Sequence, residues 1–163
     1  MIRILTQIDI PQAHDLFRTA TEDMISRGID QWDEVYPALS DIREDLEQGW
    51  SFGSFDGPVL TGYVALNESC DPEYTTGNWQ HNSGRPLYLH RLAVRPAYQG
   101  QGIAGRIISF ALEHAAENGY TALRLDAFPP NKTAVAMYEK RGFTRAGYVQ
   151  FRKGRFVLLE KVL

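Results

Sequence analysis

The sequence has one cysteine, no long hydrophobic segment and no excess of basic residues. Cys70 cannot form a disulfide within the chain, and no cysteine–histidine cluster has metal-ligand spacing, so we expect neither a disulfide framework nor a bound metal. The formal net charge is -3 at pH 7, which argues against binding to nucleic acid or to a membrane surface through bulk positive charge.

The N-terminal stretch MIRILTQIDIPQ lacks the apolar core of a signal peptide or a membrane span. We therefore expect a cytoplasmic protein. The chain has 163 residues, 44% of them hydrophobic, and contains no repeats, which predicts one domain over residues 1–163 with one core. A monomer and a homodimer are both compatible with this composition.

One stretch, LYLHRLAVRPAYQGQGIAGR from residue 87 to 106, combines a strand, a glycine-rich loop and the start of a helix. Residues 87–94 have the apolar content of a buried strand, and Pro96 ends it. Gly100 and Gly102 allow the backbone to approach a ligand closely, and apolar residues recur at helical spacing from Ile103 onward. The first turns of a helix present unpaired N–H groups at its positive end, so this loop is suited to a pyrophosphate.

Two other interpretations of the glycines compete with an anion site. An isolated Gly-x-Gly often makes only a tight turn. The glycines also spell G-x-G-x-x-G, and Asp126 lies where a Rossmann fold places its ribose-binding acid, which suggests an NAD(P) oxidoreductase. Residues 95–99 separate the strand from the first glycine, however, and too little chain follows Asp126 for further βαβ units. Both features argue against a Rossmann fold.

The same loop resembles the acetyl-CoA signature of the GNAT-type N-acetyltransferases, in which Gln or Arg is followed by x-x-Gly-x-Gly/Ala. Here it reads QGQGIA from Gln99 to Ala104. A second match, NKTAVAMYEKRGF at residues 131–143, has the order and spacing of that family's other cofactor-side motif. Because the two matches are in register, the resemblance is clear from residue 87 to 143.

The element order agrees with the fold that this resemblance implies. We expect an α/β (α+β) protein with a mixed, twisted sheet of about seven strands, helices on both faces, and two central parallel strands that splay apart at their C-terminal ends. The strands are predicted at residues 2–5, 50–55, 59–66, 87–94, 120–127, 143–150 and 155–162. Asp9 and Gln12 are predicted to cap the first helix, Ser40 the second, and Asn131 the helix at residues 132–141.

The resemblance also implies a cofactor, acetyl-CoA, and the residues that bind it. Main-chain groups of Leu92, Ala93 and Val94 would pair with the pantetheine arm, and the Leu92 N–H would polarise the thioester carbonyl. The remaining cofactor-binding residues are Gln99, Gly100, Gln101, Gly102, Ile103, Ala104, Asn131, Ala134 and Tyr138.

Proton transfer needs an acid and a base. Tyr138 occupies the position of the family's usual general acid, which would protonate the departing sulfur; the alternative is that it only packs against Val135. His90 is the best candidate base, directly or through a water, and lies on the same strand face as Tyr88; the alternative is a structural histidine. The strand resembles that of the arylalkylamine acetyltransferases, which carry a second histidine at the position of Tyr88. Asp126 is the second candidate base, or else it pairs with Arg91.

The acceptor side of the predicted site is less defined. Trp32 and Tyr36 either line an acceptor pocket or anchor their loop to the domain. Residues 67–85 form a long polar connection that is either functional or mobile. These features predict transfer of acetyl from acetyl-CoA to a primary amine of a small molecule or peptide, by direct attack in a ternary complex. A non-catalytic acyl-CoA sensor is the alternative.

Overall fold

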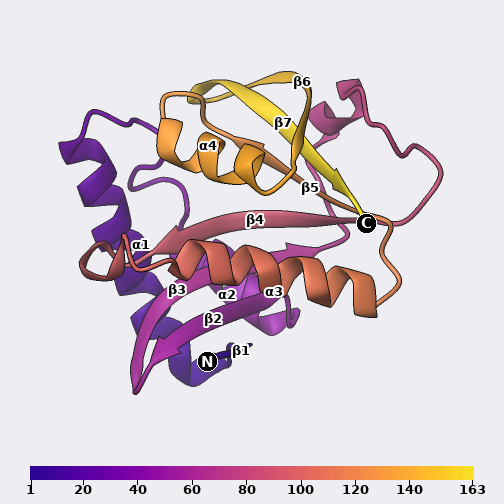
Figure 1. Cartoon of the computed structure of the whole chain (residues 1–163). Helices are drawn as coiled ribbons and strands as arrows, with labels where there is room; N and C mark the ends of the chain where they lie inside the picture. The colour runs from indigo at the N-terminus through magenta and orange to yellow at the C-terminus, as the bar shows by residue number, and fades with distance from the viewer. The chain divides into compact units, whose positions relative to one another are not determined.

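The computed structural model describes all 163 residues and contains seven strands, four α-helices and three short 3-10 helices (Figure 1). The strands form one mixed sheet in the order β1-β2-β3-β4-β5-β7-β6, which confirms the predicted fold class. The strands are β1 (Ile2–Ile4), β2 (Ser51–Asp56), β3 (Val59–Asn67), β4 (Pro86–Val94), β5 (Ala122–Ala127), β6 (Thr144–Phe151) and β7 (Gly154–Val162). The α-helices are α1 (Ile10–Ser26), α2 (Leu39–Glu47), α3 (Ile103–Glu117) and α4 (Lys132–Lys140).

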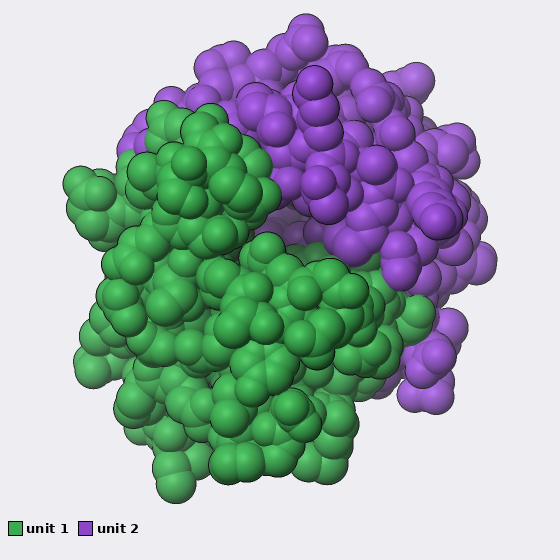
Figure 2. Space-filling view, turned by 60° about the vertical axis from the view of Figure 1, so that its left-hand side comes forward, with its two compact units in different colours: residues 1–66, 91–110 green, residues 67–90, 111–163 purple.

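The chain divides into two compact units, coloured separately in Figure 2. Unit 1 comprises Met1–Leu66 and Arg91–Phe110, and unit 2 comprises Asn67–His90 and Ala111–Leu163. The division falls inside β4, after His90, and inside α3, after Phe110. Each unit is therefore built from two separate segments of the chain. None of the helices is both long and apolar enough to cross a membrane.

In unit 1, β1, β2 and β3 pair antiparallel, and helices cover both faces of β3. Neighbouring strand residues point to opposite faces. The ring of Tyr63 packs edge-on against Phe17 of α1, with centroids 4.8 Å apart. Gly62 faces α3 so closely that an added Cβ would lie 2.6 Å from Ile107 Cδ1. Glycine at position 62 thus allows α3 to pack against the strand.

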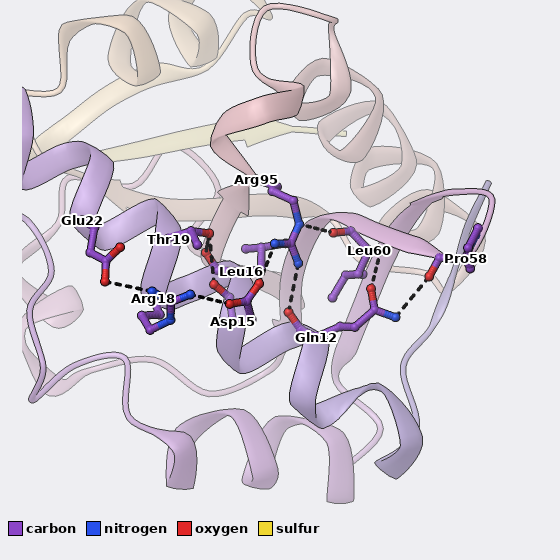
Figure 3. A network of polar contacts seen from close by, with 9 residues as sticks. All are labelled: Gln12, Asp15, Leu16, Arg18, Thr19, Glu22, Pro58, Leu60 and Arg95. Carbon is purple, nitrogen blue, oxygen red and sulfur yellow. Dashed lines mark hydrogen bonds and ion pairs between the residues drawn. The ribbon is translucent and has the colours of Figure 1, made fainter.

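The predicted Asp9–Gln12 capping box is wrong. A 3-10 helix (Gln7–Asp9) precedes α1, and the Asp9 carboxylate accepts hydrogen bonds from the Thr6 N–H and the Arg3 guanidinium. The hydrogen bond from Arg3 holds the pKa of the Asp9 carboxyl below its usual range. The Gln12 amide instead bridges to the β2–β3 hairpin, donating to Pro58 O and accepting from the Leu60 N–H (Figure 3).

The cap predicted for the second helix is also wrong. Helix α2 begins at Leu39, so Ser40 lies within its first turn. The side chain that serves the helix start is Asp41, whose carboxylate accepts from the Ala38 N–H at 2.7 Å. A carboxylate three residues after the N-cap can satisfy an amide there without a capping hydroxyl.

In unit 2, the parallel pairing of β4 with β5 is short. The ladder joins Pro86, Leu87 and Tyr88 to Ala122, Leu123 and Arg124. It ends there, although both strands continue within the unit. This early end agrees with the predicted separation of the two strands. On its other side β5 pairs antiparallel with β7, which pairs with β6.

Candidate functional site

The glycine-rich loop lies in unit 1 between β4 and α3. Gly100 and Gly102 have φ of 76° and 75°, in the left-handed region that a side chain would strain. The loop from Gln99 to Gly102 is exposed, and α3 begins immediately afterwards. None of the N–H groups of residues 100–104 donates to a backbone carbonyl. A row of unpaired donors at the positive end of a helix is the arrangement that binds phosphate groups.

Arg95 fixes the start of this loop to the rest of unit 1. Its guanidinium donates to the Asp15 carboxylate at 2.7 Å and to Leu60 O at 3.0 Å (Figure 3). Its backbone N–H donates to Thr61 O. Hydrogen bonds from Arg95 and Arg18 hold the pKa of the Asp15 carboxyl below its usual range. The segment that enters the glycine loop is thereby tied to both α1 and β3.

Arg91 interrupts β4 with a φ of 53°, which is rare for a residue other than glycine. Its guanidinium makes a two-point ion pair with Asp45 of α2 and donates to the Tyr36 hydroxyl at 2.9 Å. Asp45 is 1% exposed and also accepts from the Tyr63 hydroxyl at 2.6 Å. The alternative of an Arg91–Asp126 pair is therefore wrong. The next residue is Leu92, whose N–H is predicted to donate a hydrogen bond to the thioester carbonyl.

Burial alone would lower the pKa of the Arg91 guanidinium and is the largest single influence on it, but the hydrogen bonds and charges of Asp45 and Tyr36 together outweigh burial and raise the pKa above its usual range. Arg91 therefore stays charged.

The two aromatic residues proposed for an acceptor pocket have different surroundings. Trp32 is buried in the core of unit 1, edge-on to Phe17 at 5.5 Å, which favours the packing interpretation. Tyr36 is 37% exposed, and its hydroxyl accepts from Arg91. Tyr36 alone of this pair is placed to meet a ligand.

Tyr138 lies on α4 in unit 2 with its ring edge-on to Phe143. The residue is 5% exposed, and its hydroxyl has no hydrogen-bond partner within the protein. Burial raises the pKa of the Tyr138 phenol, and the nearby charge of Asp126 raises it further. Tyr138 therefore carries a proton at neutral pH, as an acid must. At the start of the same helix, Asn131 Oδ1 accepts from the Ala134 N–H, which confirms the predicted N-cap.

Asp126, near the end of β5, accepts a hydrogen bond of 2.6 Å from the Tyr74 hydroxyl. Burial raises the pKa of the Asp126 carboxyl to about 6; the hydrogen bond from Tyr74 opposes this shift, and the charge of Asp71 adds to it. The carboxyl is thus mostly ionised at pH 7 yet able to bind a proton just below it.

His90 and Tyr88 share one face of β4, as predicted, with ring centroids 6.4 Å apart. His90 Nε2 lies 2.8 Å from Ser69 O and 3.1 Å from Asn67 Oδ1. The Asn67 oxygen is itself identified by the Ser69 N–H, which donates to it. Since both neighbours are acceptors, Nε2 carries a hydrogen, and a neutral ring would accept a proton at Nδ1.

Two residues in these arrangements, Asp45 and Tyr74, could not be identified from the sequence. Asp45 lies 46 positions from Arg91, and Tyr74 lies 52 positions from Asp126. No motif or periodic pattern marks either of them, because their roles depend on contacts that only the folded chain creates.

The glycine loop, its exposed N–H groups and the Asn131-capped helix agree with a match to the family model described as the acetyltransferase (GNAT) family, which covers residues 12–143. The chain belongs to the GNAT acetyltransferase family.

The chain is similar to several proteins of this family. It is 37% identical over 90 residues to a bovine (Bos taurus) thialysine N-epsilon-acetyltransferase, covering 55% of this chain and 48% of that protein. The chain thus matches about half the length of this curated relative. A GNAT family acetyltransferase structure from Streptococcus agalactiae matches with a TM-score of 0.89 and 26% identity, covering 100% of this chain and 95% of that one. The PaiA N-acetyltransferase of Thermoplasma acidophilum, solved with coenzyme A, shares the fold at a TM-score of 0.75 and 18% identity, over 100% of this chain and 98% of that chain.

Proposed function

We propose that residues 1–163 form one N-acetyltransferase domain that transfers the acetyl group of acetyl-CoA to a primary amine of a small molecule or peptide. The observation that carries this proposal is the row of N–H groups at residues 100–104 that donate to no backbone carbonyl, at the end of an exposed loop and within the family's acetyl-CoA signature. Two relatives support it, since one is a thialysine N-epsilon-acetyltransferase and the other was solved with coenzyme A.

Each predicted cofactor-binding residue has a role in this proposal. The N–H groups of Gly100, Gln101, Gly102, Ile103 and Ala104 hold the pyrophosphate. The main chain of Leu92, Ala93 and Val94 binds the pantetheine arm, with the Leu92 N–H on the thioester carbonyl. Gln99, Asn131, Ala134 and Tyr138 complete the contacts.

Asp126 accepts the proton that the attacking amine loses, and Tyr138 donates one to the sulfur as the C–S bond breaks. A carboxyl with a pKa of about 6 suits a base at neutral pH. A phenol with a raised pKa is protonated at neutral pH and so has a proton to donate. His90 remains the rival base through Nδ1, with Tyr88 and Tyr36 as residues that contact the acceptor. Direct attack in a ternary complex needs no covalent enzyme intermediate.

The test is whether the purified chain binds acetyl-CoA and releases CoA when an amine is added. A panel of thialysine, lysine, diamines and peptides with free N-termini covers the acceptor classes. Acetyl-CoA at ~100 times its dissociation constant should add ~2.7 kcal/mol to stability, and an NAD(P) control should add nothing. Binding without CoA release from any amine would favour the sensor. The cytoplasmic location, the absence of metal and nucleic acid, and a homodimer stay predictions.

A further inference from the structure

The connection between β3 and β4 is held in place at several points of unit 2. It contains a 3-10 helix (Pro72–Thr76), and Tyr74 within it is 2% exposed. The Trp79 indole N–H donates to Tyr74 O at 2.8 Å, and the Tyr74 ring packs edge-on against Tyr88 at 5.5 Å. These contacts fix both the backbone and the ring of Tyr74.

Contacts further along the connection fasten it to the sheet. The Asn78 N–H donates to Ala146 O of β6, and the Gln80 N–H donates to the Glu160 carboxylate of β7, each at 2.7 Å. The Arg124 guanidinium lies 4.4 Å above the Trp79 ring and pairs with Glu160, both charged groups being buried. A long segment fastened in this way is not a mobile loop.

These contacts place the Tyr74 hydroxyl beside Asp126. The Tyr74 hydroxyl donates to Asp126 Oδ2 at 2.6 Å, from a segment 52 residues away in the sequence. A hydrogen bond to a carboxylate orients it and favours its ionised form. Burial acts in the opposite direction, because it penalises the charged form of Asp126.

We propose that Tyr74, held by the fastened connection, is a positioning residue that orients the Asp126 carboxylate and keeps it ionised for proton transfer. This inference rests on the proposed function, in which Asp126 is the base. Tyr74 holds Oδ2 of this carboxylate. The connection therefore acts on the proposed base through a single hydrogen bond.

Several other titratable groups act on Asp126 or its partner. The charge of Asp71 favours the protonated form of Asp126, and Asp126 in turn raises the pKa of Tyr138. Burial and the charge of Asp126 raise the pKa of Tyr74 well above its usual value, so its phenol remains a donor across the neutral range. Cys70 also contributes to raising the pKa of Tyr74 and of Tyr88.

The experiment compares Tyr74→Phe with Tyr120→Phe, a matched hydroxyl deletion whose hydroxyl donates to exposed Glu68. The pKa of Asp126 is measured by ¹³C NMR of the labelled carboxyl, assigned with Asp126→Asn. The acid limb of kcat/KM is measured in parallel. In Tyr74→Phe, the pKa of Asp126 and the midpoint of the acid limb should both rise by roughly one pH unit, because the ionised Asp126 carboxylate loses a hydrogen bond. In Tyr120→Phe neither should move.

An unchanged Asp126 pKa in folded Tyr74→Phe would overturn the proposal, as would an NMR shift without a matching shift of the acid limb. Equal shifts of the Asp126 pKa in Tyr74→Phe and Tyr120→Phe would also overturn it, because the shift would then be a general effect of removing a hydroxyl. The NMR titration needs no substrate. If the wild-type chain acetylates no amine, the proposed function fails on that observation alone, and with it the assigned role of Tyr74.

Discussion

The surroundings of Asp126 and Tyr138 in unit 2 raise the pKa of each side chain, with different consequences at neutral pH. Burial raises the pKa of the Asp126 carboxyl to about 6, so it can take up a proton near neutral pH. Burial and that same carboxylate raise the pKa of Tyr138, so its phenol stays protonated at neutral pH. A pair of groups with such different affinities for protons is the usual arrangement of an acid and a base.

The first prediction concerns Tyr138→Phe. The substitution keeps the ring that packs against Phe143 and removes a hydroxyl that no protein group binds, so the fold should be unaffected. If the phenol protonates the sulfur only as the C–S bond breaks, kcat and kcat/KM should fall together by ~10²- to 10⁴-fold. Acetyl-CoA affinity, measured by calorimetry, should change little.

The matched control is Tyr148→Phe, which removes an exposed hydroxyl on β6 and should retain full activity. Wild-type kcat in folded Tyr138→Phe at every pH, where chemistry limits turnover, would remove Tyr138 from the mechanism.

Single residues show where sequence reasoning succeeds and fails. Tyr138 and Asn131 were identified because a motif fixes their spacing, and the Asn131 cap is confirmed. The capping box assigned to Asp9 and Gln12 was wrong because the Arg3 guanidinium and the Thr6 amide bind the Asp9 carboxylate. The cap assigned to Ser40 was wrong because the helix begins one residue earlier, at Leu39. Neither the preferred partner nor the first residue of a helix follows from residue type alone.

At the scale of elements, the backbone of β4 depends on contacts that Arg91 makes with residues outside the strand. Its apolar content predicted a strand, and a strand is present. The sequence could not show that Arg91 takes a left-handed conformation, because such a conformation costs ~1 to 3 kcal/mol and persists only when surrounding contacts hold it. Asp45 and Tyr36 supply those contacts.

The second prediction is that Asp45→Asn strongly destabilises the protein. Asp45 is almost fully buried, and its replacement leaves the largely buried Arg91 guanidinium without a compensating charge. Breaking a buried ion pair from one side costs ~3 to 5 kcal/mol. Urea unfolding should show a loss of that size in the free energy of unfolding, at an unchanged m-value.

Asp23→Asn is the control, because it breaks an i,i+4 pair with Arg27 on the surface of α1. Such pairs contribute ~0.3 to 0.5 kcal/mol. If the two variants lose similar stability, Asp45 does not hold Arg91 in the way proposed.

For the whole molecule, strand periodicity and one family resemblance were enough to predict the class of sheet and its seven strands, with boundaries within a few residues. The division into two units was not predictable. It falls within β4 and α3, two elements that look continuous in the sequence. Compactness depends on contacts between distant segments, and a single sequence holds no direct record of them.

The last prediction is that residues 1–163 unfold as one domain. Unit 1 needs Arg91–Phe110 as well as Met1–Leu66, because Ile103 and Ile107 of α3 pack against Gly62 of β3. Since each unit takes two segments and shares β4 and α3 with the other, neither should unfold alone. Calorimetry should therefore give one transition, with equal calorimetric and van 't Hoff enthalpies.

A fragment of residues 1–66 tests whether unit 1 needs its second segment, because it lacks the helix that covers the Gly62 face. Circular dichroism should show it largely unfolded. Measuring the transition of the full chain at several protein concentrations separates unfolding from subunit dissociation, since only a homodimer has a concentration-dependent Tm. Two separate transitions in the full chain would show that the units are independent domains and that the single-domain proposal is wrong.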